Sequence, residues 1–530
     1  MGLLNWLKSE KAAPPASPAP AQPRPSSSYM RGERSPTFMG WQPALREPAA
    51  EVRDSWQMAA ARSLDAAQNS GFIAGAIDQA VANTVGNGLR LNARPDADAF
   101  GLTTKEAGDL GRRIETAFQL YSDSAIDVDA EARKTHGHLQ ASAFRHWLGT
   151  GEIFAGLPFF VRKGGAWATK VRLVPASRVA PRSDGTGKLV HGVRLDTYGA
   201  AMGYLFRSGS VDRIFGTETE IPARDRFGRP VVVHCFDGLP GAVRGISPLT
   251  PVLRVTRQFD QLADATLTAA IIQAVFAATI EGDAPTQDML RALQTPQEAA
   301  KGDVAPMDAW MDATAGWYDN TKIDLGLAGK FVHLYPGQKL NFHEAKLTGG
   351  NYEPFAKFLL REVARCLGQT FESVAADWNG TTYTGARIAT TEIHAVTLYR
   401  RKNILTPFCQ ATYEAWLEEA IDLGRVKWPG GMAAFLANRP AACKAIWRGT
   451  SKPVADDLKT AKAHEIWARL GVMTDEMIAN ELGVDIEDVY EQRQREMQMR
   501  REYGLPDPTF AGLAKDSGSD PADDQDAEAA

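Results

Sequence analysis

The residues of this chain that could carry out chemistry occur only in incomplete motifs. The pairs His343-Glu344 and His464-Glu465 begin like the zinc motif HExxH, but neither is followed by the second histidine. His136 and His138 have the spacing of two metal ligands, yet no third ligand is evident, so we interpret them as a surface pair leading into a helix. Gly187-Lys188 lacks the upstream glycine and the following Ser or Thr of a phosphate-binding loop. The sequence therefore predicts no catalytic residue, no cofactor and no metal site.

A polar loop is the most informative segment. It consists of Asp377, Trp378, Asn379, Gly380, Thr381 and Thr382. It separates two helical patterns, one over residues 352–367 and one that begins near Thr384. A metal site needs converging carboxylates, whereas one aspartate with glycine and threonines suits a sliding contact better. We expect a mobile loop, held between two helices, that touches something moving past it.

Composition limits the class of protein. A chain of 530 residues is too long for one compact core, so two or more domains are expected. The net charge of −5 resides in residues 511–530, which contain six acids and one base, so the rest of the chain is neutral. Proteins that grip duplex DNA by its phosphates usually carry a basic excess. Any contact with DNA is therefore expected to be weak or local.

The four cysteines have no CxxC spacing and are interpreted as buried small hydrophobic residues in a reducing compartment. No apolar run is long enough to cross a membrane. Residues 1–50 include a Pro-, Ala- and Ser-rich stretch and predict a disordered arm, and residues 509–530 predict a disordered acidic tail. Between them, helical patterns surround a region, residues 151–237, that changes period. Short strands are predicted there at residues 159–161, 170–174, 190–195 and 231–233, which indicates an α+β, mainly helical fold.

Two long helices are expected to pack against partners. From Pro248 to Thr279, apolar residues recur every three or four positions in a narrow stripe, as in a helix that packs on copies of itself. A second such helix follows Gly349, and Lys330 to His343 is interpreted as a hairpin between the two helices. The packing residues predicted on the two helices are Phe259, Leu262, Ile272, Phe355 and Phe358. A later long helix contains Pro407, which predicts a kink near Asn403.

Several loose motifs, taken together in order, resemble the lambda-type portal proteins of tailed bacteriophages. The resemblance covers roughly residues 50 to 500. It rests on Asn83-Thr84-Val85-Gly86-Asn87-Gly88, Gly151-Glu152, His234-Cys235-Phe236 with Arg244-Gly245-Ile246-Ser247-Pro248, Leu334-Tyr335-Pro336-Gly337-Gln338, Asn351-Tyr352-Glu353-Pro354-Phe355 and Ala386-Arg387. One departure is Tyr383-Thr384-Gly385-Ala386-Arg387, where the family usually has Tyr-Ser-Ser-x-Arg. Gly385 should loosen the exit of the loop relative to serine.

The resemblance implies a portal fold with a wing, a stem, a clip and a crown, assembled as a ring with a central channel. The implied parts are the wing (51–248), the first stem helix (249–280), the clip (281–345), the second stem helix (346–370), the tunnel loop (371–386), a long kinked helix with the wing return (387–455) and the crown helices (456–508). Residues 377–382 would face DNA, and Arg387 and Arg244 are candidates for structural ion pairs. Within residues 456–508, Thr474 and Asp485 are predicted to be the N-caps of the last two helices.

The implied function is that of a portal protein of a tailed phage or prophage, which is not an enzyme. A homo-oligomer, a dodecamer in the capsid, would form the ring at one vertex of the virion, through which the terminase large subunit packages double-stranded DNA and DNA exits to the tail. Its other partners would be a head–tail adaptor and the major capsid and scaffold proteins, with no membrane, and it would assemble in the host cytoplasm. The alternative is a capsid-associated metal-dependent hydrolase or nuclease, with Asp377 and Glu372 as ligands.

Overall fold

The fold is that of a computed structural model, which describes residues 43–207, 217–275, 279–282, 311–316, 338–341, 349–451 and 457–506. Every helix and strand named below belongs to one compact unit, Pro48–Ala530. Within the described residues, no helix is both long enough and apolar enough to cross a membrane.

Helices at the start of the unit contribute one part of its core. They are α2 (Pro48–Asn69), α3 (Gly71–Thr84), α4 (Thr104–Asp123), α5 (Ala125–Val128) and α6 (His136–Thr150), with the 3-10 turn η2 (Asp98–Phe100) before α4. Thr103 and Glu106 form a capping box that begins α4, in which each side chain binds the other residue's backbone N–H. Phe118 of α4 packs edge-on against Trp416, whose side chain is fully buried.

Two small antiparallel sheets follow in the chain. The first has the order β3-β2-β8, from β2 (Glu152–Gly156), β3 (Arg172–Val174) and β8 (Val232–Phe236). The second has the order β4-β5-β6-β7, from β4 (Leu189–Val190), β5 (Val193–Leu195), β6 (Ala201–Arg207) and β7 (Glu218–Pro222). The first sheet aligns Phe154 with both Val174 and His234. A 3-10 turn, η3 (Ala176–Arg178), follows β3.

The strands agree only partly with the sequence prediction. Strands over parts of residues 170–174, 190–195 and 231–233 are present, but the expected strand at Phe159 is reduced to one isolated bridge with Thr169. Strand β2 was not predicted, because four of its five residues are buried and its sequence lacks the alternation of a half-exposed strand.

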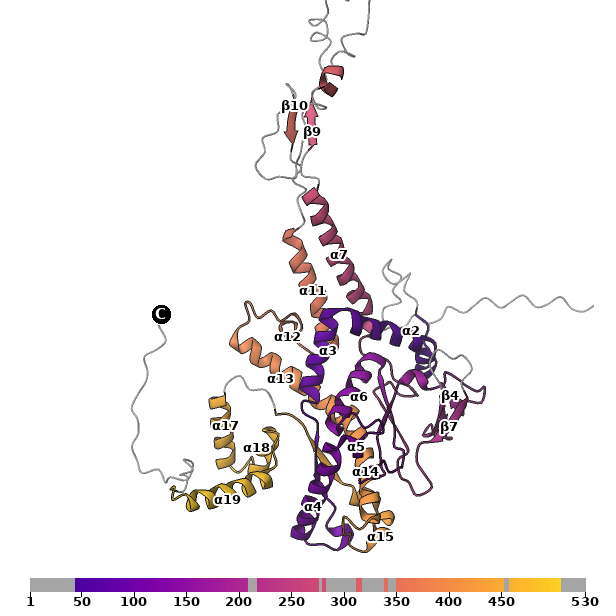
Figure 1. Ribbon diagram of the computed structural model, residues 1–530, viewed down its shortest axis with the longest axis vertical. Helices are drawn as coiled ribbons and strands as arrows, with labels where there is room; N and C mark the ends of the chain where they lie inside the picture. Colours follow the sequence, from indigo (N-terminus) through magenta and orange to yellow (C-terminus); the bar gives the residue numbers. More distant parts are fainter. Residues whose placement is uncertain are drawn as a thin grey trace, which may run out of the picture. The chain divides into compact units, whose positions relative to one another are not determined.

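The two long helices are present and lie side by side (Figure 1). The first, α7 (Leu253–Val275), follows the 3-10 turn η4 (Thr250–Val252), and the second is α11 (Gly349–Leu367). The expected extension of the first helix to residue 280 is wrong, since β9 (Thr279–Gly282) is a strand that pairs with β10 (Gln338–Asn341). The first strand of the hairpin predicted at Lys330 lies outside the described residues.

The chain after α11 continues through α12 (Phe371–Ala375), α13 (Tyr383–Arg400), the π-helical turn η5 (Arg401–Leu405) and α14 (Thr406–Asp422). The π turn lies where the sequence predicts a kink, because Pro407 cannot donate a backbone hydrogen bond and the helix must change its bonding ahead of it. The remaining elements of this part are α15 (Gly431–Ala437), α16 (Arg439–Ala442) and β11 (Ala445–Arg448), which pairs with β1 (Arg90–Ala93).

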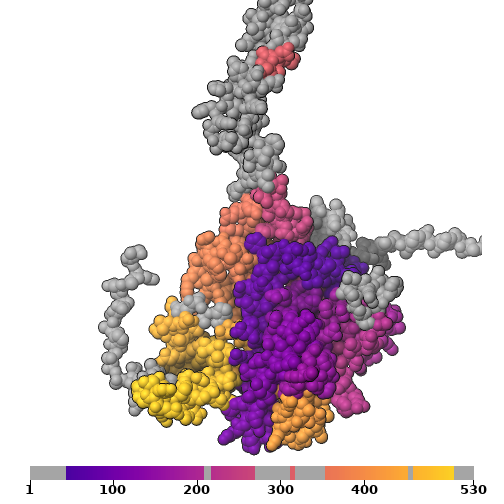
Figure 2. All heavy atoms as spheres, viewed as in Figure 1, coloured from indigo at the N-terminus to yellow at the C-terminus, as the bar shows by residue number. Residues whose placement is uncertain are grey.

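Three helices complete the described chain, α17 (Asp457–Arg469), α18 (Asp475–Glu481) and α19 (Ile486–Glu502). The predicted N-caps of the last two are confirmed, since Thr474 and Asp485 accept hydrogen bonds from the first turns of α18 and α19. Ion pairs join these helices to the body, where Arg448 contacts Asp485 and Arg112 binds Glu487 at 3.2 Å. Figure 2 shows their atoms, in yellow, adjoining the indigo and purple body.

Candidate functional site

The polar loop lies between α12 and α13. Ala376, the C-cap of α12 just before the loop, has a φ of 52° in the left-handed region, and Gly380 within the loop has a φ of 77°. Thr382 ends the loop as the N-cap of α13, and its hydroxyl accepts a hydrogen bond from the Gly385 N–H at 3.2 Å. The Trp378 side chain is 59% exposed, and Asn379, Gly380 and Thr382 are exposed as well. The loop therefore presents an indole and small polar groups to its surroundings.

The only acid of the loop, Asp377, is paired. The ammonium group of Lys357 on α11 lies 3.0 Å from its carboxylate and 2.8 Å from Glu353. The backbone N–H and side-chain amide of Asn379 also donate to Asp377, at 3.2 and 2.8 Å. The hydrogen bond from Lys357 is the largest cause that lowers the pKa of Asp377. This carboxylate therefore stays ionised, and the ammonium group of Lys357 compensates its charge. Nothing in the sequence singled out Lys357, because its contact with Asp377 exists only once α11 and the loop meet.

The far end of α13 is held by two buried arginines. Arg400 donates to the carbonyl of Leu367, the last residue of α11, at 2.6 Å, and its guanidinium lies 5.6 Å from the centre of the Trp147 ring. Arg401 donates to the carbonyl of Thr84, the last residue of α3, at 2.7 Å, and to the carbonyl of Thr450 at 3.0 Å. Carbonyl groups at helix C-termini lack backbone partners and attract cations. The two side chains thus connect the C-terminal end of α13 to the C-terminal ends of α11 and α3.

A buried charge network precedes α7. Arg244, which is 1% exposed, forms a two-atom ion pair with the fully buried Glu152, with Nε 2.8 and 2.9 Å from the two carboxylate oxygens. Arg244 also donates to the carbonyls of His191 and Ala176 at 3.2 and 3.1 Å. His234 lies 3.1 Å from the same carboxylate. The network joins both sheets to the segment that leads into α7.

Opposing effects act on the ionisation of Glu152. Burial favours the neutral carboxyl, but the charge of Arg244 and the hydrogen bond from His234 outweigh burial and lower the pKa of Glu152 to about 2. Burial lowers the pKa of His234, although its hydrogen bond with Glu152 opposes that shift. Glu152 is therefore a buried carboxylate compensated mainly by Arg244.

The predicted packing residues differ in their surroundings. Phe259 of α7 packs edge-on against Phe72 of the same chain, with ring centres 5.2 Å apart, and Leu262 is half-buried. Phe355 and Phe358 of α11 are 52% and 60% exposed. The side chain of Ile272 lies outside the described residues. Of the predicted packing residues whose side chains the structure describes, Phe355 and Phe358 are thus the exposed ones.

The structure bears on two predictions about single residues. Arg387 is exposed and makes no ion pair within the described part of the chain, so its predicted ion pair stays a prediction, for a contact between subunits. His136 is not a surface residue but is buried beside Phe118 and Phe408, because only its neighbour His138 lies on the outer side of α6. Burial lowers the pKa of His136 to about 4.

Potential metal and redox residues are dispersed. Across the described residues no three His, Cys, Asp or Glu side chains gather as a metal site. The four cysteines are free, and all are buried except Cys366, which is half-buried. His343-Glu344 lies outside the described residues.

The chain matches the lambda family of phage portal proteins over residues 34–401, which is more than half of its length. It is 28% identical to the portal protein of Escherichia phage N15 over 488 residues, which cover 90% of this chain and 91% of that protein. It is also 28% identical to portal protein B of Escherichia phage lambda over 487 residues, covering 90% of each.

Solved structures also resemble the chain, at low similarity. A chain from the neck of a native gene transfer agent particle has a TM-score of 0.36 and 12% identity, covering 73% of this chain and 92% of that one. An HK97-family portal protein from Corynebacterium diphtheriae has a TM-score of 0.29 and 12% identity, covering 65% and 87%. Likeness at this level adds nothing to the family assignment.

The chain belongs to the lambda family of phage portal proteins. It is accordingly a portal protein of a tailed phage, a structural protein rather than an enzyme, with the mainly helical α+β fold expected from its sequence. Portal proteins form ring oligomers and sit at a vertex of the virion capsid. The predicted family, fold and class of function are confirmed.

Proposed function

We propose that copies of this chain, twelve in the particle, form a ring at one capsid vertex, with residues 377–382 lining the narrowest part of its channel. The terminase large subunit would drive double-stranded DNA through this channel, and the DNA would later leave through it to the tail. A head–tail adaptor would bind at the clip, residues 281–345, and capsid and scaffold proteins would surround the ring after assembly in the host cytoplasm.

The observation that supports this proposal is the charge of the polar loop. Its one carboxylate is held by Lys357, and the loop contains no Lys or Arg, so it presents no free cation that could clamp a phosphate. Trp378, Asn379 and Thr382 remain exposed and offer weak apolar and hydrogen-bonding contacts. Such a surface lets DNA slide, whereas charge-assisted hydrogen bonds to phosphates would hold it.

Assembly is tested by electron microscopy of the purified protein in negative stain. Radially symmetric particles with a central hole support the proposal. A uniform population of compact monomers, under conditions in which the protein is folded, speaks against it. The carboxylate grouping that a metal-dependent hydrolase needs is missing from the described residues, so we do not propose that alternative.

The role of the loop is tested by shortening residues 378–382. The variant retains Asp377 and keeps a threonine directly before α13, so that the helix still has its N-cap. We expect the rings to form normally, because the anchors Lys357, Arg400 and Arg401 remain, and DNA packaging or retention to fail. A matched control shortens the exposed turn 185–187, far from α13 in sequence. If particles with the shortened loop package and retain full-length genomes normally, these residues are not the DNA contact.

A further inference from the structure

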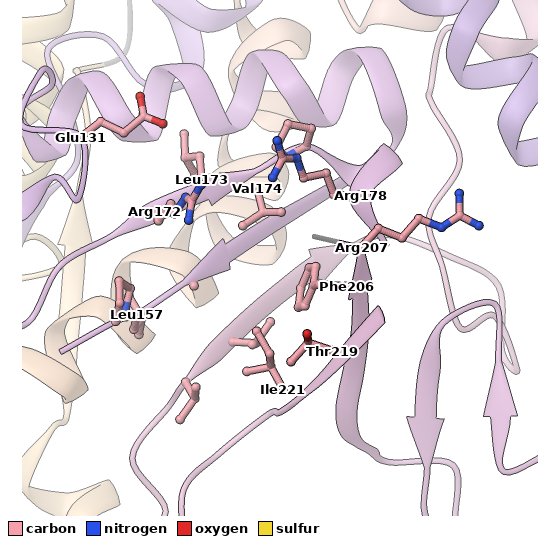
Figure 3. A pocket seen from close by; sticks show the side chains of 15 residues that line it. Glu131, Leu157, Arg172, Leu173, Val174, Arg178, Phe206, Arg207, Thr219 and Ile221 are labelled. Atoms are coloured by element: carbon pink, nitrogen blue, oxygen red, sulfur yellow. The ribbon is translucent and has the colours of Figure 1, made fainter. Parts of the chain in front are cut away.

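A groove of about 720 Å³ lies between the two sheets of the wing, away from the polar loop in the chain. Figure 3 shows its side chains, which come from β3, β6 and β7, from the ends of β2 and β8, from the turn η3 and from adjoining loops. The floor is apolar and includes Leu157, Val174, Phe206, Ile221 and Val232. A floor of this kind buries apolar side chains of a ligand, which is the usual source of affinity in protein pockets.

The sides of the groove carry an excess of positive charge. Arg172, Arg178 and Arg207 line it, with Glu131 as the only acid. Arg207 lies 3.8 Å from Glu218, while Arg172 and Arg178 have no ion-pair partner among the described residues. Guanidinium groups bind carboxylates through paired, charge-assisted hydrogen bonds. The groove therefore suits a ligand that is both apolar and acidic.

The backbone around the groove favours an extended ligand. Strand β3 is at the edge of its sheet, and β7 is at the edge of the other. Each edge strand pairs with only one strand of its own sheet. Extended peptides bind such edges with their backbone while alternate side chains enter neighbouring pockets.

The distribution of charge along the chain identifies a segment with the required chemistry. Residues 151–231 contain thirteen Lys or Arg and seven Asp or Glu, whereas residues 511–530 contain one Lys and six acids. Phe510 and Leu513 come just before these acids. The other terminal segment, residues 1–42, has five Lys or Arg and two Glu, and the arginines of the groove would repel it.

We propose that the acidic segment of residues 507–530 docks in this groove, of its own subunit or a neighbouring one. Phe510 and Leu513 lie on the apolar floor, and the following aspartates pair with Arg172, Arg178 and Arg207. A segment of 24 residues spans up to ~80 Å when extended, which is ample for a second attachment point. The docked segment occupies the arginines and so competes with other polyanions, DNA included, for this face of the wing.

The test adds a fluorescent peptide of residues 507–530 to the chain that ends at Pro506 and to the intact chain. We expect saturable binding to the shortened chain, and weaker apparent binding to the intact chain because its own segment fills the groove. Combined Arg172→Glu and Arg178→Glu substitutions should weaken binding at least about tenfold, since each removes charge-assisted hydrogen bonds. Arg226→Glu is the matched control, because this exposed arginine is in the same basic region but does not line the groove.

Peptide variants separate the apolar and acidic contributions. Phe510→Ser with Leu513→Ser should weaken binding even at low salt. Replacing Asp516, Asp520, Asp523 and Asp524 by Asn should reduce the salt dependence of binding, because four of the seven acids in the peptide are then neutral. Absence of saturable binding to a shortened chain that melts like the intact one overturns the proposal. Equal weakening by Arg226→Glu also overturns it, because the attraction would then be general. If duplex DNA binds through Arg172 and Arg178 and the peptide does not bind, the groove is a nucleic-acid site and the proposal is wrong.

Discussion

In this portal protein, buried charged residues contribute more to the stability of the fold than exposed ones do. Glu152 and Arg244 are almost completely enclosed, whereas the ion pair of Arg194 and Glu220 is exposed. Removing one member of a buried pair leaves its partner charged and without compensation, while an exposed pair is screened by water.

Glu152→Ala should therefore lower the free energy of unfolding by about 3–5 kcal/mol, since it leaves Arg244 buried beside apolar rings. Urea denaturation followed by circular dichroism measures the loss. Glu220→Ala is the control and should change the unfolding free energy little. Similar small losses in both variants would mean that the buried pair contributes no more than a surface one.

The same pair should make stability depend on acid. The pKa of Glu152 is about 2 in the folded chain and 4.5 in its ordinary range, so its contribution is complete above pH 4.5 and is lost as pH falls toward 2. The difference in unfolding free energy between the native chain and Glu152→Ala should therefore be constant from pH 7 to about 5 and then shrink. A difference that grows on acidification would contradict this assignment of the shift.

We predict that Arg387 contributes to ring assembly and that Arg400 contributes to the stability of the single chain. Arg387 is exposed in the single chain, so its proposed ion pair forms only between subunits, and Arg387→Ala should leave thermal unfolding of the monomer unchanged while reducing ring yield. Arg400→Ala removes a buried hydrogen bond to α11 and should lower monomer stability by about 1.5–3 kcal/mol. Calorimetry of monomers and light scattering of assembled protein distinguish the two. Normal ring yield with Arg387→Ala would favour a solvated residue without a structural role.

At the scale of elements, the two long helices differ in what they leave for a neighbour. α7 uses Phe259 within its own chain, against Phe72 of α3. α11 leaves Phe355 and Phe358 open, three positions apart on adjacent turns of one helical face. Among the described side chains of the two helices, α11 therefore offers two exposed aromatic rings to a neighbouring subunit, whereas α7 exposes Leu267.

Replacing Phe355 and Phe358 by Asp should block ring assembly and leave monomer melting little changed, because the charges would enter an interface rather than the existing core. Phe259→Asp is the contrasting variant and should destabilise the monomer as well, since it breaks the contact with Phe72. Analytical ultracentrifugation measures the fraction in rings. Wild-type amounts of rings from the doubly substituted α11 would remove this helix from the proposed subunit interface.

For the whole molecule, the arrangement of charge matters more than its net value of −5. The acidic segment 507–530, the basic stretch 151–231 and the polar loop, whose exposed residues are uncharged, have different electrostatic characters. Rings made from the intact chain should bind duplex DNA weakly, with a shallow dependence on salt, because the proposed channel surface releases few counterions. A filter-binding titration at several salt concentrations gives the slope. Tight binding with a steep slope in the intact chain would argue against a channel surface built for sliding.

The sequence by itself determined the features that depend on neighbouring residues or on family motifs. Thr474 and Asp485 were predictable as caps because a cap bonds within its own first turn, and Pro407 marked the interruption of a helix for the same local reason. The ordered motifs, including Arg244-Gly245-Ile246-Ser247-Pro248, were enough to indicate the portal family.

Only the tertiary structure decided the contacts between distant segments. Glu152 and Arg244 are 92 residues apart, and each alone could equally have been solvated. The pairing of Lys357 with Asp377, the burial of His136 and the groove between the two sheets depend on how finished elements meet. Local propensities specify individual elements, whereas burial and pairing follow from packing summed over the chain, which no short window of sequence contains.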